Sequence, residues 1–190
     1  ASFALLAYAS SWMKHHHPEV FLAAILNSQP MGFYAPAQLV GCARRHGVMV
    51  RPIDVNHSRW DCTLEPRSGG GLAVRLGLRM VKGLADKDAA RLVGARDVPY
   101  TAIAGLQRRT GLGSRALRCL ADADAFGTLA PSRREATWAI RGLREAPLPL
   151  FAAADEREGA VAPEAIEPKV TLAPAPAGGE VVDDYAATGL

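Results

Sequence analysis

The fold of this chain is indicated most clearly by two related stretches, RRTGLGSRALRCL at residues 108–120 and MVKGLADKDAARLV at residues 80–93. In each stretch, a short turn rich in small residues is followed by apolar residues at helical spacing. The turns share one pattern, in which an apolar residue stands between two small ones: Gly111, Leu112 and Gly113 in one copy, and Gly83, Leu84 and Ala85 in the other. The sequence therefore predicts two tight turns, each leading into a helix.

Both turns match the helix-hairpin-helix pattern, whose chemistry depends on the backbone. Small residues let a phosphate approach closely, and the first N–H groups of the next helix point toward it along the helix dipole. The apolar residue of each turn is expected to face inward, and Ser114 is expected to cap the second helix. Nearby basic side chains add attraction without base reading. The predicted site for double-stranded DNA comprises Lys82, Gly83, Leu84, Ala85, Lys87, Arg108, Arg109, Gly111, Leu112, Gly113, Ser114 and Arg115.

A purely structural role is the alternative for each turn taken alone, because a glycine between two helices often serves only as a C-cap. Two copies in the basic part of the chain favour phosphate binding instead. The first copy departs from the strict pattern, since Ala85 stands in place of the second glycine.

Charge is divided unevenly along the 190 residues. The net charge is +3 over residues 1–60, +6 over residues 61–145 and −6 over residues 146–190, which makes +3 in total. An arginine-rich segment followed by an acidic tail is typical of a nucleic-acid-binding region joined to something else, although a solvated charged surface is an alternative.

Together with the rest of the chain, the pattern of apolar and turn residues predicts a mainly α-helical chain with a small β element, an α+β fold. Residues 1–47 are expected to be helical, with the first helix largely buried, and residues 48–78 to form the β element, including a half-buried strand at 73–78. Residues 79–145 form the tandem helix-hairpin-helix region. Residues 146–179 are a flexible linker rich in proline, alanine and acidic residues, and residues 180–190 begin another, truncated domain.

Several other functions find little support in the sequence. The three cysteines, Cys42, Cys62 and Cys119, are scattered, which argues against a disulfide framework or zinc module and favours the reducing cytoplasm. No uncharged stretch is long enough for a membrane helix. Consecutive histidines at residues 15–17 diverge by about 100° each on a helix, so they suit a helix end better than a metal site. The pairs Asp86 with Asp88 and Asp122 with Asp124 suit helix edges better than catalysis.

A short apolar motif, PLPLF, interrupts the predicted linker at residues 147–151. Flexible segments often present such anchors to a groove of a partner protein, so Leu148, Leu150 and Phe151 are candidate partner-binding residues. The alternative is that they pack back on their own domain.

Longer stretches carry a resemblance to a known family. LNSQPMGFY at residues 26–34, VMVRPIDVNHSRWDCTLE at residues 48–65 and AVRLGLRMVKGLADKDAARLV at residues 73–93 resemble the C-terminal half of bacterial C-family DNA polymerases. The chain looks most like the error-prone, damage-inducible relative of the polymerase III α subunit. The resemblance implies the end of a fingers domain at residues 1–47, the tandem hairpins, and the start of an oligonucleotide-binding (OB) domain at residues 180–190.

The resemblance also implies function. The intact protein would be a DNA-directed DNA polymerase that transfers deoxynucleotides past damaged bases, with two Mg²⁺ held by carboxylates of an upstream palm domain, so this fragment would need no cofactor and be inactive alone. A sliding clamp and mutasome proteins are implied partners. The segment from Leu148 to Phe151 is similar to the family's clamp-binding motif, with Pro147 where glutamine is expected.

Two other classes of function stay open from the residues alone. One is a stand-alone helix-hairpin-helix repair module, and the other is a mutasome interaction scaffold whose hairpins are only structural. A first helix that starts without an initiator methionine or cap favours the fragment interpretation over the repair module.

Overall fold

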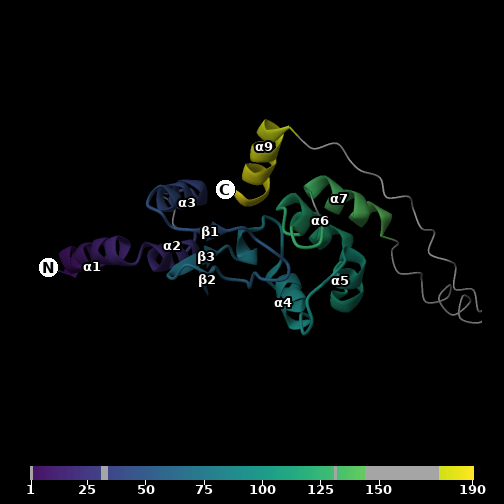
Figure 1. Cartoon of the computed structure of the whole chain (residues 1–190), viewed down its shortest axis with the longest axis horizontal. Coiled ribbons are helices and arrows are strands. Elements are labelled where there is room, and N and C mark those ends of the chain that lie inside the picture. The colour runs from purple at the N-terminus through teal and green to yellow at the C-terminus, as the bar shows by residue number, and fades with distance from the viewer. Residues whose placement is uncertain (1, 31–33, 131, 144–175) are drawn as a thin grey trace, which may run out of the picture.

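The computed structural model describes residues 2–30, 34–130, 132–143 and 176–190, and it confirms a mainly helical fold with one small sheet (Figure 1). The sheet lies between the N-terminal helices α1 to α3 and a helical group that contains both hairpins. The elements are α1 (Ser2–His16), α2 (Pro18–Asn27), α3 (Pro36–Arg45), β1 (Val50–Arg51), β2 (Thr63–Pro66), β3 (Leu72–Arg75), the 3₁₀ helix η1 (Leu78–Met80), α4 (Asp86–Gly94), α5 (Ile103–Thr110), α6 (Ser114–Asp122), α7 (Arg133–Gly142) and α9 (Ala177–Thr188).

The first helix differs from expectation in its burial. Phe3, Leu6 and Tyr8 of α1 are 84%, 66% and 69% exposed, so the prediction of a largely buried helix is wrong. The reason is that α1 extends from one end of the molecule and packs mainly against α2 (Figure 1). Apolar composition alone does not bury a helix, because burial also needs a partner surface.

The sheet has the strand order β1-β3-β2, with β1 parallel and β2 antiparallel to β3. The loop of residues 67–71 connects β2 and β3, and Gly70 and Gly71 adopt positive φ there. The predicted half-buried strand at residues 73–78 is wrong in length and pattern. The strand ends at Arg75, and Ala73, Val74 and Arg75 are all buried, because β3 is the central strand and packs beside α2.

A charge cluster holds the three strands together. Glu65 on β2 accepts hydrogen bonds from Arg51 on β1, at 2.5 Å, and from Nε and Nη2 of Arg75 on β3, at 2.9 and 3.1 Å. Hydrogen bonds from Arg75, and next from Arg51, outweigh the burial of Glu65 and lower the pKa of its carboxyl. The remaining guanidinium nitrogen of Arg75, Nη1, donates to the Pro52 carbonyl at 2.8 Å.

The loop after β1 joins the sheet to the helical group. The Asn56 side chain donates to the Tyr100 carbonyl at 3.0 Å and accepts from the Tyr100 N–H at 2.8 Å. The buried Asp54 carboxylate accepts from the Thr128 N–H at 3.2 Å. One hydrophobic core therefore extends from α2 through β3 to α6, and the hairpins stand on a continuous scaffold.

The C-terminal segment is helical. Helix α9 begins at Ala177, so the predicted linker boundary at residue 179 lies too late, and residues 180–188 belong to this helix. The start of an OB domain at residues 180–190 stays a prediction. The candidate partner-binding residues Leu148, Leu150 and Phe151 lie outside the described residues. Within the described ranges, no helix combines the length and apolarity that crossing a membrane requires.

Candidate nucleic-acid interface

The second hairpin is formed by the end of α5, the turn at residues 111–113 and the start of α6. Gly111 has a φ of +63°, a left-handed conformation that favours glycine, and its N–H closes the last turn of α5 on the Gln107 carbonyl at 2.8 Å. Leu112 is 2% exposed, which confirms that it faces inward. Gly113 has a φ of −73° and is the N-cap of α6, so the expectation that Ser114 caps the helix is wrong. Ser114 lies one residue inside the helix.

The turn leaves a group of donors directed outward. Gly113, Ser114 and Arg115 are exposed. Their backbone N–H groups have no acceptor among the described residues, because the first amide that bonds back to the turn is that of Leu117, to the Gly113 carbonyl at 3.2 Å. The first turn of α6 contains no acidic residue. An anion at this place would meet unpaired amides and the positive end of a helix dipole.

Gly113 is not required by the fold. Its φ is one that any residue adopts, and a Cβ built on it meets nothing within 4 Å. The missing side chain therefore leaves open space over the amides of α6, which is what close approach of a phosphate needs.

The first hairpin has the same backbone pattern but different surroundings. Gly83 has a φ of +80°, Leu84 is buried as predicted, and Ala85 is the extended N-cap of α4. The element before this turn is the short 3₁₀ helix η1 rather than an α-helix. Asp86 and Asp88 occupy the first turn of α4, so carboxylates already stand where a phosphate would bind.

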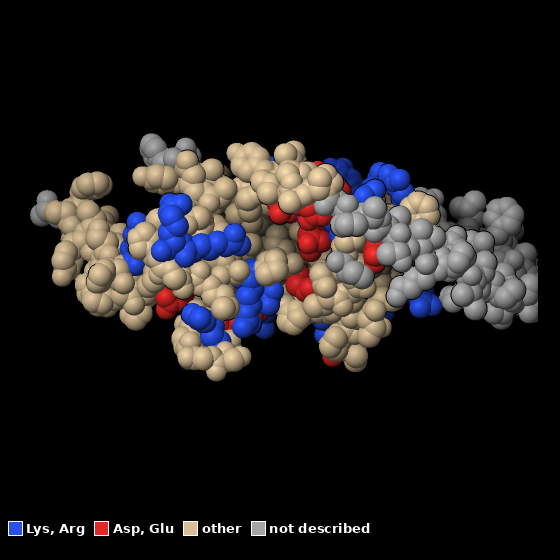
Figure 2. Space-filling view, turned by 45° about the horizontal axis from the view of Figure 1, so that its top comes forward, with Lys and Arg blue, Asp and Glu red and all other residues tan. Residues whose placement is uncertain are grey.

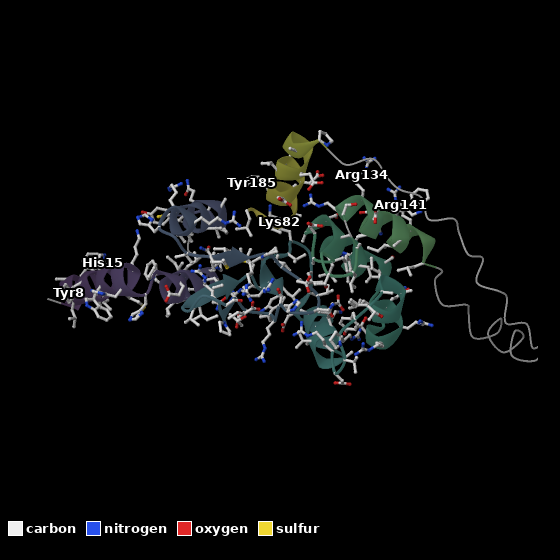
Figure 3. All side chains as sticks on the ribbon, in the orientation of Figure 1. Tyr8, His15, Lys82, Arg134, Arg141 and Tyr185 are labelled. Atoms are coloured by element: carbon white, nitrogen blue, oxygen red, sulfur yellow. The ribbon has the colours of Figure 1, made fainter. Side chains whose placement is uncertain are left out.

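Lys82 of the first hairpin is engaged by α9. Its backbone N–H donates to the Ala187 carbonyl, and its Nζ donates to the carbonyls of Tyr185 and Ala186, each at 2.9 Å. An ammonium group at this position satisfies the last carbonyls of α9 and complements the negative end of its dipole. Figure 3 shows Lys82 beneath the end of α9, next to Tyr185. The structure thus separates Lys82 from the donors of the second hairpin.

The other predicted basic residues fall into two groups. Arg109 is engaged within the protein: Nη1 donates to the Val98 carbonyl at 2.8 Å, Nη2 donates to the Ala95 carbonyl, and the guanidinium lies 4.5 Å from the centroid of the Tyr100 ring. A second group is exposed and has no hydrogen bond or ion pair with any described residue. This group consists of Lys87, Arg108 and Arg115.

The carboxylate pairs lie at helix ends and form no metal site. Asp86 and Asp88 lie in the first turn of α4 as expected, whereas Asp122 ends α6 and Asp124 follows it with a φ of +50°, so the helix dipole does not favour the second pair. Burial, opposed by Arg133, raises the pKa of Asp124. Among the described residues, no three His, Cys, Asp or Glu side chains could hold one metal ion, and His15 and His16 end α1.

Charge is also distributed unevenly in space. Figure 2 shows acidic side chains gathered beside α9, with basic side chains on both sides of them. The acidic residues of α9 are Glu180, Asp183 and Asp184. Because the end of α9 holds Lys82 of the first hairpin, these carboxylates disfavour a phosphate at the first hairpin.

One set of surface residues was missed from the sequence. Arg134, Trp138 and Arg141 are exposed on α7 and line a groove between α6, α7 and α9. The sequence did contain a signal: a basic residue, an aromatic residue four positions later and a basic residue three positions after that. This spacing places the three side chains on one helix face. It was hidden because Ala136 and Ile140, on the buried face, define the helix equally well.

Comparison with known proteins supports the hairpin assignment and the resemblance. The helix-hairpin-helix motif family matches residues 47–136, which include both turns. Over its whole length, the chain is 60% identical to error-prone DNA polymerase 1 of Agrobacterium fabrum, 58% identical to error-prone DNA polymerase 2 of Rhizobium meliloti and 50% identical to error-prone DNA polymerase of Pseudomonas paraeruginosa. It spans about 18% of the length of each of these curated relatives. The chain is therefore homologous, from end to end, to one segment of these error-prone DNA polymerases, and it carries a helix-hairpin-helix motif.

Proposed function

We propose that this chain is the segment of an error-prone DNA polymerase that grips the backbone of duplex DNA, and that the second hairpin provides the main contact. The observation that carries the proposal is the open N-terminus of α6, where the amides of Gly113, Ser114 and Arg115 point outward beneath a glycine that the fold does not require. A phosphate oxygen accepts hydrogen bonds from these amides, and the side chains of Arg108 and Arg115 add screened attraction.

The first hairpin has a smaller part in this proposal. Lys82 is engaged by α9, and Asp86 and Asp88 lie at the start of α4, so Gly83, Leu84 and Ala85 support the fold more than they bind phosphate. Lys87 stays a candidate for long-range attraction. Binding through backbone amides and a few arginines recognises the shape and charge of a duplex and no base sequence.

Salt dependence distinguishes one working hairpin from two. If the second hairpin and its arginines neutralise about three phosphates, the logarithm of duplex affinity falls against the logarithm of salt concentration with a slope of about −2.7, whereas four phosphates on two hairpins give about −3.6. Fluorescence anisotropy with a labelled duplex at several salt concentrations measures this slope. Duplexes of different sequence are expected to bind equally. A flat salt profile would contradict the proposal.

Replacing Gly113 with valine is expected to weaken duplex binding about tenfold without unfolding the protein. The added side chain fills the space above the amides of α6, and losing hydrogen bonds to a charged group costs about 1.5 kcal/mol or more. Gly69→Val is the matched control, because Gly69 also has open space around it and lies in the loop between β2 and β3. Circular dichroism checks folding of both variants. Unchanged duplex affinity in a folded Gly113→Val protein would favour the interaction-scaffold alternative.

The activity of the whole protein is part of the proposal. We infer from the relatives' names that the intact protein transfers deoxynucleotides during error-prone synthesis, with double-stranded primer-template as its substrate. We infer from the resemblance that the carboxylates that would hold Mg²⁺ lie in other parts of that protein, so this chain alone is expected to be inactive. Because its substrate would be genomic DNA, the intact protein is expected in the cytoplasm. Sliding-clamp and mutasome contacts rest only on Leu148, Leu150 and Phe151 in the sequence.

A further inference from the structure

A groove of about 630 Å³ lies between α6, α7 and α9, away from the second hairpin's open turn. Its basic and aromatic lining residues are Lys82, Arg133, Arg134, Trp138 and Arg141. Figure 3 shows Arg134 and Arg141 extending from the same side of α7, with Lys82 below the end of α9. A volume of this size is in the range of sites that hold small ligands or parts of a polymer.

The outward face of α7 carries a row of basic and aromatic side chains. Arg134, Trp138 and Arg141 fall within about 60° of one another around the helix axis and span about 10 Å along it. The opposite face, with Ala136 and Ile140, is buried in the core. Trp138 is 54% exposed, so a large aromatic surface stands open between two guanidinium groups.

The floor of the groove contains a buried arginine. The Arg133 side chain is 9% exposed and pairs with Asp184, and its Nη1 lies 3.6 Å from Asp183. Its Nε and Nη1 have no hydrogen-bond acceptor among the described residues, so part of its donor capacity is unused although Asp183 and Asp184 balance its charge. Asp122 and Asp183 are the acidic residues in the lining, against four basic ones. Arg141 has no hydrogen bond or ion pair within the part of the chain that the structure describes.

We propose that this groove binds a single strand of DNA, with a base stacked on Trp138 and neighbouring phosphates held by Arg134 and Arg141. Exposed aromatic rings flanked by basic side chains are the combination that binds single strands without sequence preference, since every base has a stacking face and every linkage carries a charge. An acidic peptide would satisfy the arginines but would leave the exposed indole ring without a stacking partner.

The position of the groove relative to the duplex site supports this inference. Gly113 lies at the start of α6, whereas Cys119 and Asp122, near the other end of the same helix, line the groove. The two sites are therefore about 13 Å apart along α6. A duplex that ends in a single-stranded extension has the shape to occupy both. The inference adds a second ligand to the proposed duplex binding and does not depend on it.

The test uses the whole chain and a labelled twelve-nucleotide oligothymidylate, which cannot form a duplex. Trp138→Ala is expected to weaken its binding about tenfold, because base-aromatic stacking is lost, while Trp138→Phe retains most of the affinity. Affinity for a blunt duplex stays unchanged in both variants. Trp12→Ala is the matched control, since Trp12 is 47% exposed on α1, at the far end of the molecule. Arg141→Gln is expected to reduce the magnitude of the oligothymidylate salt slope by about 0.7.

Three results would overturn the inference. Oligothymidylate affinity could be the same in Trp138→Ala as in the unaltered chain. Duplex and single strand could lose affinity equally, which would make the groove part of the duplex site. Polyglutamate could compete with oligothymidylate at equal charge in a manner that depends on Trp138, which would assign the groove to an acidic peptide. Gly113→Val separates the two proposals, because it weakens duplex binding and leaves oligothymidylate binding intact.

Discussion

Replacing Gly77 with alanine is expected to lower the free energy of unfolding by about 3 kcal/mol, because the new methyl group would overlap with backbone atoms. A Cβ on Gly77 would lie 2.4 Å from both the Asp61 carbonyl carbon and the Trp60 oxygen, and 2.7 Å from the Cys62 nitrogen. Gly77 has a φ of −84°, which alanine adopts freely, so the cause is space and not backbone conformation.

The two segments around Gly77 cannot separate easily. The Leu78 N–H donates to the Arg59 carbonyl at 2.8 Å, and the Arg79 N–H donates to the Trp60 carbonyl at 3.0 Å. Moving them apart to accept a methyl group would break these bonds at the point where the sheet joins the first hairpin. A small shift of the backbone therefore cannot relieve the clash without a loss of stability.

Urea unfolding followed by circular dichroism measures this effect as a lower midpoint. Gly94→Ala is the matched control, because Gly94 ends α4 and a Cβ there meets nothing within 4 Å, so a neutral or slightly stabilising effect is expected. Equal urea midpoints for the Gly77→Ala and unaltered chains would show that the loop at residues 60–62 moves aside for the methyl group, contrary to the packing described above.

Replacing Glu65 with alanine is expected to cost about 3 kcal/mol of stability. Arg75 is 8% exposed and would lose its carboxylate partner while staying in the sheet, and breaking a buried ion pair on one side is more costly than removing both partners. Arg51 would lose its 2.5 Å contact as well. Thermal unfolding at neutral pH tests this, with Asp97→Ala as a control at an exposed carboxylate that has no hydrogen bond or ion pair among the described residues.

The same residue makes stability depend on pH. The pKa of Glu65 is lower in the folded chain than in the unfolded one, so its contribution is complete above the unfolded pKa of about 4.3 and is lost as the pH falls through the folded value. Glu65→Gln, which cannot ionise, should lose less stability than the unaltered chain over this acid range. Parallel pH profiles for the two proteins would argue against the ion cluster as the source.

Much of the hairpin geometry could be predicted because it is local. The left-handed conformation of Gly111, the inward side chain of Leu112 and the helix after it all follow from residues within one turn of each other. The mistake at Ser114 shows the limit, since the choice between neighbouring residues as N-cap depends on where the turn places the first helical φ and ψ.

Burial was harder to predict, because it depends on partners that are distant in sequence. The apolar residues of α1 suggest a core helix, yet they stay exposed where only α2 packs beside them. Alternation along β3 suggests a half-buried strand, yet consecutive residues of this strand are buried, and α2 packs against it. The sequence pattern indicates which residues can be buried, and the packing of the elements decides which residues are buried.

The amino-acid order alone thus determined two glycine turns, their inward leucines and a helical chain with a small sheet, because each of these depends on short-range spacing. The resemblance to C-family polymerases rests on longer matching stretches of sequence. Only the tertiary structure decided that the hairpins are unequal. Lys82 meets the Tyr185 carbonyl 103 residues away, and α7 meets α9 in a groove with an exposed tryptophan. Contacts over such separations are created by packing of whole elements, which no local pattern encodes.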